Sequence, residues 1–242
     1  MRLAPAAIVA ATLATLANAS IANAAPIYSQ TPTGGDGFVV SDRGNGTNGF
    51  RFADDFTLAA AGTVRSVTWR GTYVDGTLPP ADALKFKLTF YATNGLNAPD
   101  NTNVNGLGNT DVLFTAASLT QVGTATNGNV VRPLYEFRAD LTAPVALAAG
   151  TRYWFSAMAD TSSQADNNFR WYGSGSTVTH GFQNNVAGNG TFATNTFSQG
   201  PTLYFVLDDA AVAPVPEPAG LALLGAGAVG LLARRRRAAA AR

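Results

Sequence analysis

The stretch Leu84-Lys85-Phe86-Lys87-Leu88-Thr89-Phe90-Tyr91 decides the fold class of this chain. Apolar side chains stand at every second position, and lysine, threonine and tyrosine fill the positions between them. Because successive side chains of a β-strand point to opposite faces, this pattern predicts a strand with one face in a core and the other toward solvent. Between Pro26 and Ala213 no capped apolar 3.6-residue period runs longer than a turn or two, so we expect no long helix there.

The same period of two recurs along the middle of the chain. It predicts longer strands around Phe50–Phe56, Val67–Tyr73, Tyr135–Leu141, Tyr153–Ala157 and Leu203–Leu207, and shorter ones at 37–40, 112–115, 169–172 and 177–182. Asn-Gly pairs, which tolerate positive φ, separate many of these runs and favour hairpins and loops. Many short strands with such turns are typical of an antiparallel β-sandwich or jelly roll. We expect one all-β domain over residues 26–209.

Composition excludes several classes of protein. The 242 residues contain no cysteine and one histidine, so disulfides, thiol catalysis, cysteine-based metal sites and multi-histidine sites within one chain are excluded. The formal net charge of +1 argues against an electrostatic nucleic-acid binder. We expect no cofactor and no metal. A weaker alternative is calcium at Asn101–Gly106, where side-chain oxygens have an EF-hand-like spacing but the bidentate glutamate is missing.

The N-terminal residues 1–24 have the organisation of a secretory signal peptide. Met1-Arg2 is a positive n-region, Leu3–Leu16 is apolar, and Ala22 and Ala24 occupy the small-residue positions of a cleavage site. An earlier cleavage site at Ala17-Asn18-Ala19 and a retained membrane anchor are the alternatives.

The C-terminal residues have three parts after a short linker at 210–214. Val215-Pro216-Glu217-Pro218 is followed by the uncharged run 219–233 and then by Arg234–Arg237. The run predicts a transmembrane helix of roughly 22 Å, and the arginines form a stop-transfer tail on the cytoplasmic side. The main domain is then expected outside the cytoplasm.

This tail, residues 215–238, resembles the PEP-CTERM sorting signal of Gram-negative, exopolysaccharide-producing bacteria. The resemblance implies that an exosortase, a membrane transpeptidase, recognises Pro216, Glu217 and Pro218, cleaves nearby and releases the domain to the cell surface or matrix. Arg234, Arg235, Arg236 and Arg237 would form the retention tail. A plain tail anchor is the alternative. The middle also resembles the bodies of many PEP-CTERM proteins, through the acidic strand Ala53–Leu58 and the tryptophan strand Val67–Gly71, which supports a β-sandwich and implies no activity.

Charge separates the ends from the middle. When Arg2 and the arginines of the tail are left out, ten basic and fifteen acidic residues remain, which gives the middle a net charge of −5. The exported domain is therefore expected to be acidic, whereas the precursor is slightly basic.

Catalytic candidates are few, and we expect no enzyme. The only histidine and two nearby serines could form part of a triad, and three acids could form a carboxylate pair; these residues are His180 with Ser174 or Ser176, and Asp54 or Asp55 with Glu136. No nucleophile-elbow motif accompanies the serines.

Aromatic side chains supply the other functional candidate. Adjacent Trp171 and Tyr172 must face opposite sides of a strand, so one of them should point away from the core. Together with Trp69 they are candidate contacts for carbohydrate, because aromatic rings stack on apolar sugar faces. We therefore expect a non-catalytic surface or extracellular-matrix protein whose partners are an exosortase, the secretion machinery and an exopolysaccharide. A carbohydrate-binding module is the alternative, and a hydrolase is third.

Overall fold

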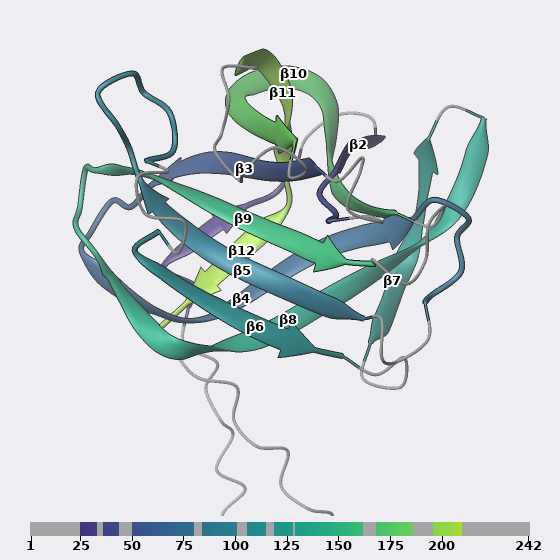
Figure 1. The fold of residues 1–242 in the computed structure, drawn as a ribbon, viewed down its shortest axis with the longest axis horizontal. Helices are drawn as coiled ribbons and strands as arrows, with labels where there is room; N and C mark the ends of the chain where they lie inside the picture. Colours follow the sequence, from purple (N-terminus) through teal and green to yellow (C-terminus); the bar gives the residue numbers. More distant parts are fainter. Residues whose placement is uncertain are drawn as a thin grey trace, which may run out of the picture.

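The computed structural model describes residues 25–32, 36–43, 50–79, 84–100, 106–114, 119–127, 129–161, 168–185 and 196–209. In this part of the chain the fold is all-β, and every ladder between strands is antiparallel, as the alternation predicts (Figure 1). The described residues contain no helix that is long and apolar enough to cross a membrane. The predicted signal peptide, linker and sorting segment (1–24 and 210–238) lie outside the described residues.

Twelve strands follow one another along the chain. They are β1 (Tyr28–Gln30), β2 (Asp36–Val40), β3 (Phe50–Thr57), β4 (Gly62–Tyr73), β5 (Lys85–Ala92), β6 (Gly108–Leu113), β7 (Thr120–Asn127), β8 (Val130–Leu147), β9 (Arg152–Asp160), β10 (Phe169–Asn185), β11 (Thr196–Leu203) and β12 (Phe205–Asp208).

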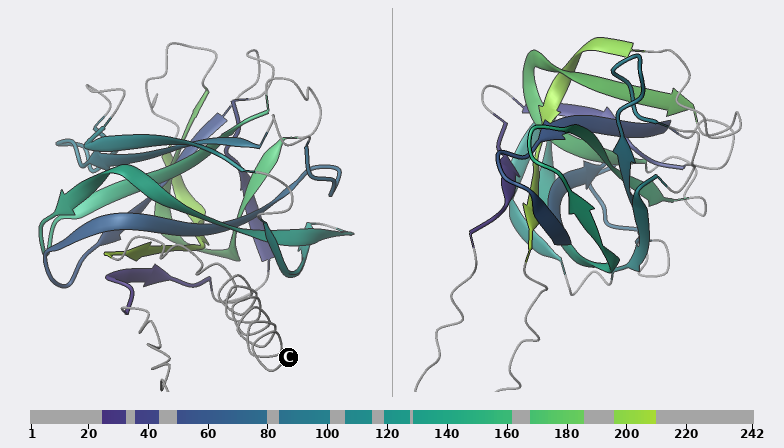
Figure 2. Two further views of the ribbon diagram at one scale, coloured as in Figure 1. Left: turned by 90° about the horizontal axis from the view of Figure 1, so that it is seen from below. Right: turned by 90° about the vertical axis from the view of Figure 1, so that its left-hand side faces the viewer.

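The strands form one sheet that folds into two layers (Figure 2). One layer has the order β3-β9-β5-β6. The other contains β1, β12 and β4, with β8 and β7 on the far side of β4. Strand β10 joins them, because its first residues pair with β4 and its last residues pair with β3. The sheet therefore forms a sandwich-like body with a core between its layers.

Aromatic rings from both layers fill this core. Phe86 of β5 lies 5.2 Å from Trp69 of β4, 4.9 Å from Phe137 of β8 and 4.9 Å from Phe169 of β10, measured between ring centroids. The packing leaves room only for a glycine at position 71, since a Cβ there would lie 2.2 Å from the Phe169 ring. The three ring contacts of Phe86 fix β5 against the opposite layer.

A second, smaller cluster covers the outer face of β3, β5 and β9. It consists of Ala53, Tyr91, Trp154 and Phe182, all of them buried. Phe182 comes from the last part of β10, and its ring lies 5.0 Å from that of Trp154. The prediction that Tyr91 faces solvent is therefore wrong: it is 1% exposed, and its hydroxyl accepts a hydrogen bond from Arg51 Nη1 at 2.9 Å.

Several strand predictions need correction in detail. The short runs at 169–172 and 177–182 belong to the single strand β10, which is 17 residues long. The run ending at Leu207 is divided into β11 and β12 at Tyr204. The short β1 and the polar β7 were not predicted, because neither has an apolar alternation of useful length.

Candidate functional site

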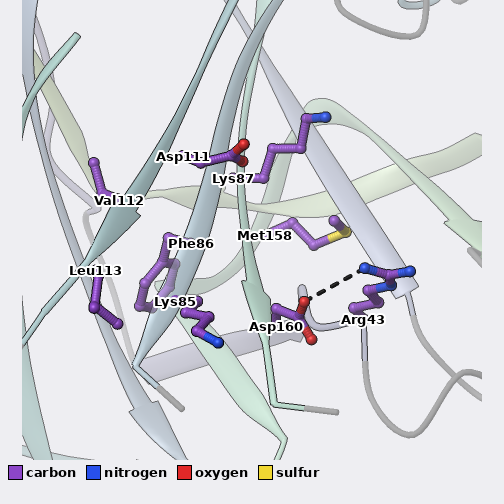
Figure 3. Close-up of a pocket in the computed structure, with 9 residues that line it drawn as sticks. All are labelled: Arg43, Lys85, Phe86, Lys87, Asp111, Val112, Leu113, Met158 and Asp160. Atoms are coloured by element: carbon purple, nitrogen blue, oxygen red, sulfur yellow. Dashed lines mark hydrogen bonds and ion pairs between the residues drawn. The ribbon is translucent and has the colours of Figure 1, made fainter. Parts of the chain in front are cut away.

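A groove of about 410 Å³ lies on the layer formed by β9, β5 and β6 (Figure 3). Its lining combines basic, acidic and apolar side chains: Arg43, Lys85, Phe86, Lys87, Asp111, Val112, Leu113, Met158 and Asp160. The strand register arranges most of them in two rows. Lys85 lies between Leu113 and Asp160, and Lys87 lies between Asp111 and Met158. Residues directly opposite each other in antiparallel strands share a face, so each row runs across the groove.

Lys85 and Lys87 are the only two lysines of the chain. They occupy one face of β5, because side chains two apart on a strand point the same way. Within the part of the chain that the structure describes, neither of them forms an ion pair, whereas Arg43 Nη1 lies 3.4 Å from Asp160 Oδ2. The groove was not predicted from sequence, although two lysines alternating with core residues in the opening stretch were the available signal.

The predicted carbohydrate contacts separate into core and surface residues. Trp69 and Trp171 are fully buried, so their proposed role in contacting a sugar is wrong. Trp69 stacks on Phe137, and Trp171 packs against Phe155 while its Nε1 donates to the carbonyl of Tyr204 at 3.0 Å. Each indole therefore has its packing partners inside the sandwich.

Tyr172 lies on the opposite face of β10 from Trp171, as the alternation predicts. It is half-buried, it makes an edge contact with Phe38 at 5.7 Å, and its hydroxyl donates to Asp36 Oδ1 at 3.1 Å. Partial burial raises the pKa of the Tyr172 hydroxyl, and the hydrogen bond and charge of Asp36 raise it further. Tyr172 is thus the only one of the three predicted aromatics at the surface.

The acidic candidates for hydrolysis have separate partners. Asp55 lies 3.2 Å from Arg152 of β9, and Glu136 lies 2.9 Å from Arg70 of β4, in the other layer. The side chains of His180, Ser174 and Ser176 lie outside the described part of the structure, as do residues 101–105 of the calcium candidate. The described residues include no group of three His, Cys, Asp or Glu side chains that could hold a metal ion.

Asp54 is the least expected of the acids, because it is fully buried. Its carboxylate accepts hydrogen bonds from Gln30 Nε2 (2.6 Å), Leu203 N (2.9 Å) and Asp55 N (3.0 Å). Burial raises the pKa of Asp54 to about 8, and the negative charge of Asp55 adds to this rise, while the hydrogen bonds offset only part of it. Gln30 in turn accepts a hydrogen bond from the Tyr28 hydroxyl at 2.6 Å. Asp54 therefore ties β1 and β11 to β3.

Both ends of the described domain lie beside each other. Strand β1 is antiparallel to β12, with Tyr28 opposite Leu207, and Ile27 N donates to the carbonyl of Leu207 at 2.9 Å. In an antiparallel pair the start of one strand adjoins the end of the other, so residue 25 and residue 209 leave the domain on the same side. The predicted signal cleavage site and the predicted linker are thus attached at one end of the molecule.

Comparison with protein families identifies the segment that follows. Residues 214–237 match the PEP-CTERM protein-sorting motif. The chain carries a PEP-CTERM sorting motif. The match contains Pro216–Pro218 and Arg234–Arg237, which confirms the resemblance seen in the sequence. A PEP-CTERM motif indicates an exported protein that an exosortase processes. A search of curated proteins found no match to the chain.

Proposed function

We propose that this chain is a non-catalytic component of the cell surface or extracellular matrix, where it associates with exopolysaccharide after exosortase processing. The PEP-CTERM motif at 214–237 carries the proposal, because it indicates export and processing. The signal peptide at 1–24 directs secretion, and the helix at 219–233 holds the precursor in the inner membrane until cleavage near Pro216–Pro218. A non-catalytic role is consistent with Asp55 and Glu136, whose carboxylates are engaged by arginines of different layers.

The arrangement of the two ends supports this route. Because β1 and β12 are neighbours, a membrane attachment through either end would hold the same side of the domain toward the membrane. The groove on β9, β5 and β6 belongs to the layer that contains neither β1 nor β12. Removal of both membrane segments would release a domain that keeps all of its described strands.

Glu217→Ala, or deletion of Arg234–Arg237, is expected to leave an unprocessed, membrane-bound protein. The first change removes part of the motif that the exosortase recognises, and the second removes the arginine tail of the sorting signal. Cell fractionation followed by intact-mass measurement checks this in the native host. Asp209→Ala removes an exposed acid just before the linker and serves as the control that should be processed normally. Equal release of the Glu217→Ala protein and the wild type would contradict the sorting proposal.

A carbohydrate-binding module is the second candidate, and the position of Tyr172 is the observation that favours it. Tyr172→Ala is expected to weaken retention on a polysaccharide column roughly tenfold, which is the size of one stacking contact. Tyr172→Phe keeps the ring and removes only the hydroxyl that contacts Asp36, so it should retain binding. Affinity electrophoresis in polysaccharide gels measures both. Identical mobility of Tyr172→Ala and wild type would reject a role for this ring.

A further inference from the structure

We propose that the groove on β9, β5 and β6 binds acidic polysaccharide, with Lys85 and Lys87 as the contacts for carboxylate groups of uronic-acid units. This inference rests on the proposed function, which brings the exported domain to exopolysaccharide, and it names the class of polysaccharide and the site. The binding site differs from the Tyr172 surface, since β5 and β10 share no ladder.

The placement of the lysines is the first argument. The region 26–209 is acidic, with ten basic and fourteen acidic residues, yet both lysines lie in the groove. Three of the arginines elsewhere are engaged with acids, in the pairs Arg70–Glu136, Arg138–Asp208 and Arg152–Asp55. Side chains two apart on one strand face are roughly 6.6–6.8 Å apart at their Cα atoms. An extended polyanion lying along β5 would meet both ammonium groups.

The acids of the groove leave these two cations available. Asp160 is held by Arg43, so this pair contributes little net charge. Asp111 lies across from Lys87 in the strand register but forms no ion pair with it in the described structure. Two unpaired ammonium groups therefore face one unpaired carboxylate, and the local charge is opposite to that of the whole domain. Such a local reversal attracts anions into the groove.

The apolar part of the groove fits a sugar better than a nucleic acid. Leu113, opposite Lys85, is 62% exposed, whereas Met158 beside Lys87 is only 5% exposed. Sugar rings present apolar C–H faces between their charged groups, which match the exposed hydrocarbon of Leu113 next to the ammonium group of Lys85. Single-stranded nucleic acids instead use exposed aromatic rings as stacking platforms. Phe86 is the one aromatic residue of the lining, and its ring packs in the core and is only 2% exposed.

The scaffold holds the backbone of the two lysines in place before any ligand arrives. Phe86 lies between them in sequence and is locked by Trp69, Phe137 and Phe169 of the opposite layer. Both neighbours of β5 are paired in register, β6 on one side and β9 on the other. Binding therefore requires ordering of the lysine side chains but no rearrangement of the backbone, which favours affinity.

Binding of the processed protein, purified from its native host, tests the site. The probes are polygalacturonate, its methyl ester, neutral dextran and double-stranded DNA. We expect salt-sensitive binding to polygalacturonate that is lost when the carboxylates are esterified. Lys85→Gln/Lys87→Gln should weaken this binding about tenfold or more. The matched control is Arg65→Gln, which removes an exposed cation from β4 in the other layer and should bind like the wild type.

A chemical measurement on the unmodified wild-type protein gives an independent test. Because the chain has only two lysines, amine-directed acetylation can modify only Lys85, Lys87 and the α-amino group. Bound polygalacturonate should slow acetylation of both lysines several-fold and leave that of the α-amino group unchanged. Peptide mass mapping reads all three rates in one sample, so the result does not depend on a variant that folds.

Three results would overturn the inference. They are equal binding of the double variant and the wild type, unprotected lysines in the presence of bound polygalacturonate, and equal affinity for double-stranded DNA or for methylated polymer. These results leave the proposed function intact if the double variant still fractionates with the matrix. The proposed function itself fails if the wild-type protein is never found at the surface or in the matrix, whatever its affinity for polygalacturonate.

Discussion

Replacing Phe86 by alanine is expected to lower the free energy of unfolding by about 3–5 kcal/mol. The ring is 2% exposed and contacts aromatic rings of three strands in the opposite layer, so its removal leaves a cavity that rigid neighbours cannot fill. The whole domain is expected to have only about 5–15 kcal/mol of stability. Urea unfolding, followed by the fluorescence of the three buried tryptophans, measures the change.

Phe38→Ala is the matched control for this prediction. Phe38 is half-buried, and its aromatic contact is with Tyr172 on the outer face, so the loss should be about 1 kcal/mol. If both variants lose the same stability, Phe86 is not the link between the layers that the structure shows. Phe86→Ala should also reduce binding in the groove, because the strand that carries Lys85 and Lys87 loses its anchor.

Phe86 also shows how much of the fold could be predicted from sequence. The alternation at 84–91 correctly places Leu84, Phe86, Leu88 and Phe90 in the core, because burial of one strand face leaves a direct pattern in the chain. The same pattern predicts solvent on the other face, which is right for Lys85, an exposed residue, and wrong for Thr89 and Tyr91, which are each 1% exposed. Tyr91 is buried in one cluster with Phe182, which follows much later in the sequence, and alternation within one strand contains no information about such a partner.

The candidate sites show a similar division. The sequence could place Trp171 and Tyr172 on opposite faces of one strand, but it could not tell which of the two faced the core. The structure puts Trp171 inside and Tyr172 outside. The groove depends on the register of β5 with β6 and β9, which brings Leu113 and Asp160 to either side of Lys85. Register between distant strands cannot be read from a single sequence without such a structure.

Asp54 shows why a strand with acidic residues is not necessarily a surface strand. Its neighbour Asp55 makes an ion pair with Arg152 at 3.2 Å, whereas Asp54 points inward and accepts hydrogen bonds from Gln30 and from the backbone of Leu203. These contacts join the first strand of the described domain to the strand just before β12. A buried acid at this junction makes the closure of the domain sensitive to protonation.

The stability of the domain is therefore expected to fall as the pH rises from about 4 to about 8. The pKa of Asp54 is about 8 in the folded protein, against 3.8 as the ordinary value, so in this interval the folded state binds more protons than the unfolded state. Stability decreases with pH under that condition, by at most about 1.4 kcal/mol per pH unit for one group. Between pH 5 and pH 8 the contribution of Asp54 amounts to as much as ~4 kcal/mol.

Asp54→Asn removes the titrating group, so its unfolding free energy should lose this decline and change little between pH 5 and pH 8. At pH 8 the variant should approach or exceed the wild type, because the buried carboxylate no longer has to ionise. At pH 5 it should be less stable by about 1–3 kcal/mol. The reason is that the side-chain NH2 group of asparagine would face an N–H donor whose hydrogen bond the carboxyl oxygen of Asp54 accepts. Urea unfolding at the two pH values measures both effects.

Asp209→Asn, which changes an exposed acid, should follow the wild type at each pH. A slope in Asp54→Asn equal to that of the wild type would assign the pH dependence to other groups, because Asp54 would then titrate alike in the folded and unfolded states.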